Sequence, residues 1–163
     1  MTRKRARADD RRFLAAAIAE SAANARSGKG GPFGAVVVKN GRIVGRGRNR
    51  VTESRDPTAH AEVVAIRAAC RRLRSHDLSG ATVYASCEPC PMCFSAILWS
   101  RATRLVYANS QKDAAAIGFD DAAFWRAVKT WPRTQAIDAS RLADARARAA
   151  FARWFGNSKK TPY

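Results

Sequence analysis

The sequence predicts an α/β fold of three layers, α/β/α, in which a central mixed sheet of about five strands is flanked by helices. The chain has 163 residues, a length typical of one domain. Its periodic segments follow the order helix, strand, strand, helix, strand, helix, strand, helix, which is typical of a sheet covered by helices. Sequence repeats and long linkers are both lacking, so residues 1–163 are expected to form a single domain.

The first predicted elements are a helix and a β-hairpin. The helix is expected after Asp9-Asp10, because four apolar residues share one of its faces: Phe13, Leu14, Ala17 and Ile18. Residues 27–32 have the composition of a loop. Residues 34–38 predict a buried strand, and Asn40-Gly41 is a strong signal for a tight turn into a returning strand over residues 42–48.

The rest of the chain alternates helix and strand. A helix is expected from Asp56-Pro57-Thr58 to about Arg74. The later strands are expected over 82–86 and 104–108, with a short fifth strand at 135–137. The later helices are expected over about 91–100 and over 139–155, with a short helix between them that ends at Lys129.

Composition alone leaves two interpretations open. The chain carries 30 Lys+Arg against 13 Asp+Glu, a formal charge of +17, and only 29 of its 163 residues are Leu, Ile, Val or Phe. This combination is typical of a disordered nucleic-acid-binding chain, but an Ala/Arg-rich globular domain also has it. A transmembrane protein is excluded, because no stretch approaches the ~20 apolar residues of a membrane span.

The N-terminus and the cysteines favour the cytoplasm. Arg11-Arg12 and the following apolar run resemble a twin-arginine export signal, but the run stops at Glu20 and fits an amphipathic helix better. Cys87, Cys90 and Cys93 are too close in sequence to pair with one another without strain. Their density therefore indicates metal binding or catalysis in a reducing compartment.

Two short motifs carry the chemistry: His60-Ala61-Glu62 and Pro89-Cys90-Pro91-Met92-Cys93. One imidazole and two thiolates are three protein ligands for tetrahedral zinc, and the fourth position is left to water. Both motifs lie at expected helix N-termini, where the helix dipole favours a thiolate. Zinc lowers the pKa of its bound water to about 7, so hydroxide is available at neutral pH. Glu62 is the candidate to move the proton of that water.

Other metal sites fit the cysteines less well. A structural zinc needs a fourth ligand, and neither Cys70, expected within a helix, nor His76, expected in a turn, has a paired spacing. An iron–sulfur site would need a further cysteine where the chain has Ile97. Cys87 fits neither pattern and is expected to be a small buried residue near the site.

The segments Pro57-Thr58-Ala59-His60-Ala61-Glu62 and Cys87-Glu88-Pro89-Cys90-Pro91-Met92-Cys93 resemble the cytidine/deoxycytidylate deaminase superfamily. The chain looks most like the branch that holds bacterial guanine deaminases and tRNA adenosine deaminases. Asp113-Ala114-Ala115, Gly118-Phe119-Asp120-Asp121 and the terminal Tyr163 favour guanine deaminase. The resemblance implies a cytidine deaminase-like fold and one Zn²⁺ per subunit, held by His60, Cys90 and Cys93.

For the activity, the resemblance implies zinc-dependent hydrolytic deamination of guanine to xanthine and ammonia. Zinc hydroxide would attack carbon 2 of the purine, and Glu62 would shuttle a proton to the adjacent ring nitrogen. Asp121 would bind the guanine edge and help to protonate the departing amine. The other implied substrate contacts are Phe33, Asn49, Ala61, Trp99 and Tyr163. The resemblance also implies a homodimer that exchanges a C-terminal segment of about residues 132–163.

Four of these side chains also have a purely structural interpretation. Phe33 and Trp99 fit a hydrophobic core, Asn49 can simply end a strand, and Asp121 can cap the helix that follows it. The chain also departs from the usual guanine deaminase pattern at two places. Phe94-Ser95 replaces a pair of small residues behind the cysteines, and Thr161-Pro162 precedes the last tyrosine.

The sequence is also compatible with other functions. The first is a tRNA adenosine deaminase, for which the +17 charge offers affinity for phosphates, although the basic residues are spread along the chain rather than clustered. The substrate of a guanine deaminase-like enzyme could also be guanosine or a related aminopurine or aminotriazine. The last is a non-enzymatic RNA-binding protein with a structural zinc, which would need no role for Glu62.

Overall fold

A computed structural model describes residues 3–161, which contain one mixed sheet of four strands in the order β2-β1-β3-β4. The strands are β1 (Gly34–Lys39), β2 (Arg42–Arg48), β3 (Thr82–Cys87) and β4 (Arg104–Asn109). β1 is antiparallel to both β2 and β3, whereas β4 runs parallel to β3. The mixed sheet is confirmed, but the expected fifth strand at residues 135–137 does not form. Ile137 is exposed, and among residues 3–161 no strand lies beside it to complete a ladder of hydrogen bonds.

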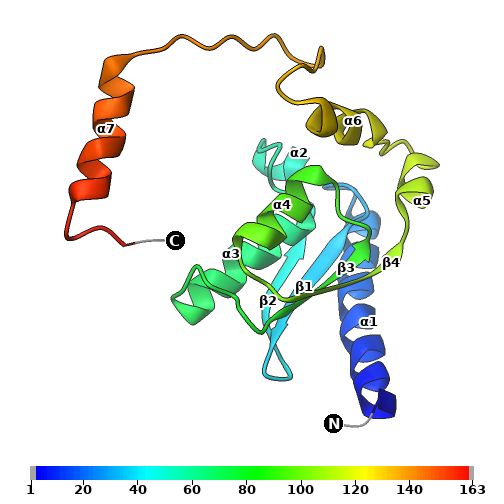
Figure 1. Cartoon of the computed structure of the whole chain (residues 1–163). Coiled ribbons are helices and arrows are strands. Elements are labelled where there is room, and N and C mark those ends of the chain that lie inside the picture. Colours follow the sequence, from blue (N-terminus) through cyan, green and yellow to red (C-terminus); the bar gives the residue numbers. More distant parts are fainter. Residues whose placement is uncertain (1–2, 162–163) are drawn as a thin grey trace.

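Helices cover both faces of this sheet, which confirms the three layers (Figure 1). The helices are α1 (Arg3–Ser27), α2 (Val51–Ser54), α3 (Ala61–Leu73), α4 (Pro91–Trp99), α5 (Gln111–Ala115), α6 (Ala122–Thr130) and α7 (Ala145–Gly156). On one face, Phe13 and Ala17 of α1 pack against Val36 and Tyr84. On the other face, α3 and α4 pack against β1 and β3 around a second cluster, which includes Ala65, Ala69, Ile97, Val37 and Val83.

Close packing of small residues explains how a chain with few large apolar side chains folds. Gly45 and Gly47 of β2 lie directly against α3, where an added Cβ would come within 2.2 Å of the Ala65 carbonyl oxygen and 2.1 Å of the Ala61 carbonyl oxygen. Only glycine allows this approach of strand to helix. Alanine and glycine residues therefore allow strand and helix to pack closely in this part of the core. The interpretation of the chain as disordered is wrong.

Three helix boundaries differ from those expected, each for a local reason. α1 begins at Arg3 rather than after Asp9-Asp10, because arginine and lysine are good helix formers. α3 begins only at Ala61, because Asp56 accepts hydrogen bonds from the backbone N and the hydroxyl of Thr58 (2.8 and 2.6 Å) and holds this segment in a turn. α7 begins at Ala145, where Asp144 accepts a capping hydrogen bond from the backbone N of Arg146 (2.7 Å).

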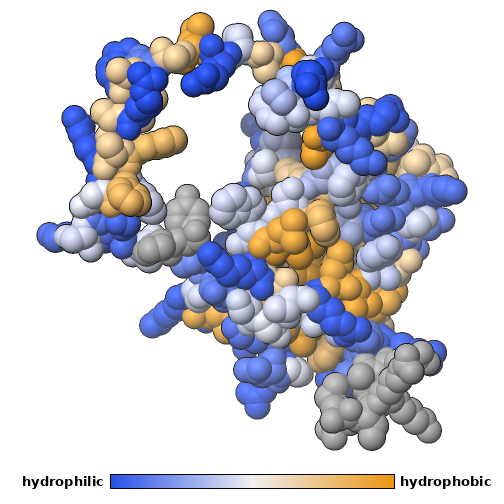
Figure 2. Space-filling view, viewed as in Figure 1, coloured by the Kyte–Doolittle hydropathy of each residue, from blue (hydrophilic) through white to orange (hydrophobic). Residues whose placement is uncertain are grey.

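The described part of the chain after α6 forms an arm, residues 131–161, that leads away from the sheet and carries α7 (Figure 1). The space-filling view shows the same arm looping away from the body (Figure 2). Its large apolar side chains are unburied: Leu142 is 91% exposed, Phe151 80% and Phe155 77%. Within residues 3–161, none of the helices is both long and apolar enough to cross a bilayer.

Candidate active site

The N-termini of two helices bring the predicted zinc ligands together. His60 and Cys90 are the residues immediately before α3 and α4, and both have extended backbone conformations. Cys93 lies in the first turn of α4. The turn at Asp56 that delays the start of α3 therefore sets the place of His60. Pro91 fits the first position of α4, because the backbone N of that position needs no hydrogen-bond partner within the helix.

The spacing of the three ligand atoms fits a tetrahedral zinc ion. The His60 Nδ1 atom lies 3.6 Å from Cys90 Sγ and 3.5 Å from Cys93 Sγ. A tetrahedral zinc with ordinary bonds to sulfur and nitrogen requires a sulfur–nitrogen separation of about 3.5 Å. Among the described residues the group contains only His60, Cys90 and Cys93, so the ligand set is the open, three-residue kind that leaves a position for water.

The protonation of the two cysteines suits metal binding. Hydrogen bonds from Cys93 and from His60 lower the pKa of Cys90 to about 4, so that Cys90 is a thiolate. The same interaction with Cys90, together with burial, raises the pKa of Cys93. The hydrogen bond between His60 and Cys90 raises the pKa of His60. The three groups therefore share protons that a bound cation would displace.

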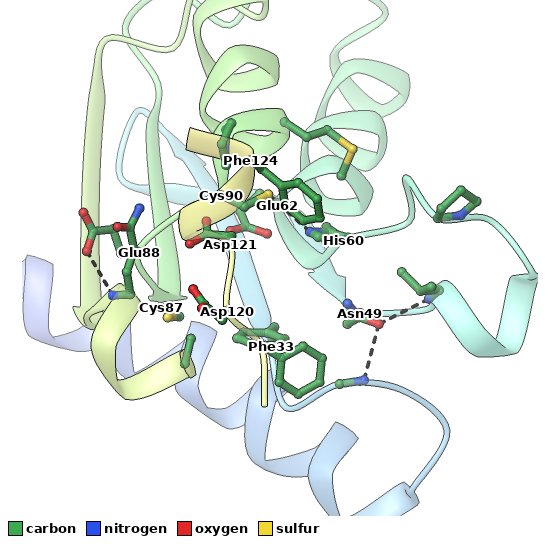
Figure 3. A pocket seen from close by; sticks show the side chains of 18 of the residues that line it. Phe33, Asn49, His60, Glu62, Cys87, Glu88, Cys90, Asp120, Asp121 and Phe124 are labelled. Atoms are coloured by element: carbon green, nitrogen blue, oxygen red, sulfur yellow. Dashed lines mark hydrogen bonds between the residues drawn. The ribbon is translucent and has the colours of Figure 1, made fainter. Parts of the chain in front are cut away.

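Glu62 lies beside the ligands and is almost completely buried, with 8% exposure. It belongs to the first turn of α3, two residues after His60, and its Oε2 accepts a hydrogen bond from the Cys93 thiol at 3.4 Å. Burial raises the pKa of this carboxyl. In Figure 3, Glu62 faces the same pocket as His60 and Cys90. This position allows it to exchange protons with a ligand held next to the zinc site.

The pocket in front of these residues has a volume of about 790 Å³. Phe33 forms one wall, and the ring of Phe119 packs edge-on against it with centroids 4.9 Å apart. Asn49 contributes another wall, where its Oδ1 accepts hydrogen bonds from the backbone N–H groups of Gly31 (3.3 Å) and Val51 (3.2 Å) (Figure 3). These two bonds fix the amide group with its oxygen turned to the backbone, so its NH₂ is the group available to a ligand.

Asp121 lines the pocket rather than capping a helix. Within residues 3–161, its carboxylate caps no backbone N–H, although it directly precedes α6. Its neighbour Asp120 accepts the hydrogen bond from the backbone N of Ala122 instead (2.9 Å). Burial and the nearby Cys90 raise the pKa of Asp121. Asp121 thus presents to the pocket a carboxyl that is not used as a helix cap, as a substrate contact requires.

Two predicted substrate contacts, Ala61 and Trp99, do not line this pocket within the described chain, and a third cannot be placed. Ala61 is fully buried where α3 meets β2. Trp99 is 70% exposed at the C-terminal end of α4, so the alternative interpretation of Trp99 as a core residue does not hold. Tyr163 lies outside the described residues.

The structure adds pocket residues that sequence reasoning missed. Phe119 and Asp120 lie in the Gly-Phe-Asp-Asp segment, and Glu88 lies between Cys87 and Cys90, so their motifs were available as a signal. Glu88 Oε2 accepts a hydrogen bond from the backbone N of Gln111 (3.1 Å), which ties β3 to the start of α5. Cys87 is buried, its thiol donates to the Ser110 carbonyl oxygen (3.5 Å), and burial raises its pKa to about 11. It is a neutral thiol beside the site, as expected.

Comparison with known families agrees with this site. Residues 7–109 match the cytidine and deoxycytidylate deaminase zinc-binding region. The matched region contains His60, Glu62, Cys90 and Cys93. The chain therefore belongs to the cytidine and deoxycytidylate deaminase family, a family of zinc-dependent enzymes, and His60, Cys90 and Cys93 are positioned to bind its metal.

Within the family, the chain is similar to guanine deaminase from Bacillus subtilis, with 49% identity over 116 residues that cover 71% of this chain and 74% of the relative. The crystal structure of that enzyme superposes with a TM-score of 0.90 and 39% identity, covering 100% of this chain and 99% of that one. Guanine deaminase from Nitrosomonas europaea gives a TM-score of 0.64 and 37% identity over 68% of this chain and 64% of that one. A tRNA-specific adenosine deaminase from Aquifex aeolicus is 44% identical over 50% of this chain and 54% of its own length.

Proposed function

We propose that this protein is a guanine deaminase, which hydrolyses guanine to xanthine and ammonia. The observation that carries the proposal is the extent of the likeness to the Bacillus subtilis guanine deaminase structure. That likeness covers the whole chain, including the segment with Asp121 and the C-terminal arm, whereas the matched family region ends at residue 109. The likeness to the tRNA-specific enzyme extends over only half of each chain.

The charge of the pocket supports a small base as the substrate. Among the described residues, four carboxylates and neither lysine nor arginine line the pocket, in a chain with 30 basic residues. The carboxylates are those of Glu62, Glu88, Asp120 and Asp121. A substrate with phosphate groups would meet like charges at this pocket, whereas the N–H groups of guanine find acceptors there. This distribution opposes a tRNA substrate, which needs cationic contacts near the reacting base.

The residues around the pocket divide the reaction between them. His60, Cys90 and Cys93 would hold the zinc, which when bound would lower the pKa of a water ligand and so supply the nucleophile at neutral pH. Glu62 accepts a proton from the attacking water and delivers it to the ring nitrogen next to carbon 2 of guanine. The water oxygen bonds to carbon 2, and the bond from carbon 2 to the amino nitrogen breaks. Asp121 helps to pass the second proton of the water from the new hydroxyl to the departing nitrogen, so that ammonia and the carbonyl group of xanthine form. Asn49 donates to the purine edge, and Phe33 stacks on its rings.

The direct test is incubation of the zinc-loaded protein with a panel of guanine, guanosine, 2,6-diaminopurine, adenine, cytosine and unmodified tRNA. We expect xanthine and ammonia to form in equal amounts from guanine, with no inosine in the tRNA. Chromatography of the bases and a coupled ammonia assay measure both products. Inosine in tRNA without xanthine from guanine would instead establish the adenosine deaminase, and absence of any turnover by protein with confirmed zinc would exclude both.

We further propose a homodimer in which residues 132–163 are exchanged and Tyr163 closes the partner's site. The apolar side chains of the arm contact nothing that buries them, and the body exposes apolar residues on α4 and α6 that need a cover: Phe94, Leu98, Trp99, Phe124 and Val128. The pocket is also larger than one purine base fills, and Phe124 and Val128 belong to its walls. A second copy of the arm would cover these surfaces together.

Size-exclusion chromatography with light scattering tests this assembly. The wild type is expected at the mass of a dimer, and the double variant Phe151→Glu/Phe155→Glu at that of a monomer, because both side chains lie on one face of α7. Arg153→Glu introduces the same acidic group on a different side of α7 and is the control that should stay dimeric. A double variant that remains dimeric would show that α7 does not hold the copies together.

We place the enzyme in the cytoplasm. All four cysteines are outside disulfide bonds, including the two at the metal site. Thiolate ligands in a pocket open to solvent persist best where the surroundings are reducing.

A further inference from the structure

Asn24 of α1 is a buried polar residue far from the zinc site in sequence, with 2% exposure. Its Nδ2 donates two hydrogen bonds, to the carbonyl oxygen of Gly31 (2.7 Å) and to the carbonyl oxygen of Asn49 (2.8 Å). Both protons of the amide are therefore used, and both are used on segments that form the pocket. Asn24 itself is not among the residues lining the pocket.

The bonds of Asn24 complete a ring of three hydrogen bonds. Asn24 donates to Gly31, the backbone N of Gly31 donates to the Asn49 side chain, and the Asn49 carbonyl oxygen accepts from Asn24. The side-chain amide of Asn49 is thereby fixed relative to its own main chain and to the loop. The Gly31 carbonyl oxygen also accepts from the backbone N of Phe33 (2.8 Å), so the main chain of Phe33 is tied to the same ring.

The packing around this ring has no spare room. An added Cβ on Gly30 would lie 2.4 Å from the Asn49 carbonyl oxygen and 3.1 Å from Asn24 Nδ2. An added Cβ on Gly31 would lie 3.1 Å from both the Phe33 and the Phe119 rings. Two glycines thus let the loop approach Asn24 on one side and the aromatic wall on the other. A shift of the loop would move both the wall and the Asn49 amide.

We propose that Asn24 is a positioning residue for substrate binding, which holds Asn49 and Phe33 in the arrangement that receives the purine. This proposal rests on the proposed function, because it assigns Asn49 and Phe33 to the base. Asn24 contacts neither Glu62 nor the zinc ligands, so its contribution is to the affinity for the base and not to the chemical step. A residue that acts only on binding changes KM and leaves kcat in place.

Asn24→Ala tests this assignment. The variant removes the donor of the buried Asn49 carbonyl oxygen and opens the ring, and we expect KM for guanine to rise about tenfold with kcat within about twofold of wild type. Zinc content and thermal unfolding are measured on the same preparations. Asn24→Ser keeps a single donor, is expected to give an intermediate KM, and replaces the alanine variant if that variant does not fold.

Ser21→Ala is the matched control. Ser21 also lies on α1 and donates to the same loop, at the Pro32 carbonyl oxygen (2.6 Å), but it does not contact Asn49. We expect its KM to stay within about twofold of wild type. In an Asn49→Ala background, Asn24→Ala should raise KM by less than it does in the wild type, because one of the two groups that it positions is already absent.

The outcomes separate this proposal from the proposed function. If folded Asn24→Ala and Asn24→Ser lose thermal stability with unchanged KM, or if the effects of Asn24→Ala and Asn49→Ala simply add, Asn24 is structural only and the proposal is overturned. If the wild type deaminates another base of the panel, the guanine assignment fails, and KM for that base is compared instead. If the wild type deaminates none, the proposed function fails and this inference fails with it.

Discussion

Replacement of Cys90 by alanine is expected to remove zinc from the protein and to reduce deamination to background. Cys90 is the ligand that the site already holds as a thiolate, with a pKa lowered to about 4. Without it, His60 and Cys93 remain, and two ligands do not make a stable zinc site. The measurements are the zinc content of the purified protein by atomic emission and the release of ammonia from guanine.

Cys87→Ala is the control for this loss, because Cys87 is a buried cysteine only three residues before Cys90. Its thiol donates to the Ser110 carbonyl oxygen, and it is outside the ligand group. We expect one zinc per chain in Cys87→Ala. One zinc per chain in Cys90→Ala, or loss of zinc in Cys87→Ala, would contradict the ligand assignment. Circular dichroism of both variants shows whether a loss reflects the site or the fold.

The zinc site was predictable because ligand chemistry restricts it. Zinc accepts few residue types, and His60, Cys90 and Cys93 come with spacings that put each beside the start of a helix. The strands were predictable for a similar reason. Asn40-Gly41 fixes the turn between β1 and β2, and the apolar run of β1 has no other place than the interior. The zinc site and the hairpin depend on residues close together in the chain, so they can be predicted from one sequence.

The features that could not be predicted depend on distant or competing partners. The family resemblance implies a substrate contact for Asp121, but the residues alone also allow it to cap a helix. Asp121 lines the pocket, and Asp120 takes the hydrogen bond at the start of α6. Residues 135–137 look like a strand, but whether they form one depends on a neighbouring strand, and the arm has none. Trp99 is a large apolar residue of the kind found in cores, but at the end of α4 it is 70% exposed.

The second large effect is expected for Glu62→Gln, which should keep its zinc and lose turnover. Glutamine has nearly the same shape and occupies the same buried position in the first turn of α3, so the ligands next to it should stay in place. It has no carboxylate to take up and return a proton, and removal of such a group lowers kcat by about 10²- to 10⁴-fold. Steady-state deamination of guanine, with zinc measured on the same sample, gives both quantities.

Glu88→Gln separates proton transfer from the general charge of the pocket. Glu88 is another carboxylate on the pocket wall, but its Oε2 is bound to the backbone N of Gln111, on a segment away from the zinc ligands. We expect kcat of Glu88→Gln to stay within about tenfold of wild type, because a glutamine oxygen can still accept that hydrogen bond. Equal losses in the two variants would mean that the pocket needs its negative charge as a whole. A fully active Glu62→Gln with zinc bound would mean that another group moves the proton, and Asp121, the remaining pocket carboxyl with a raised pKa, would then be the next to test.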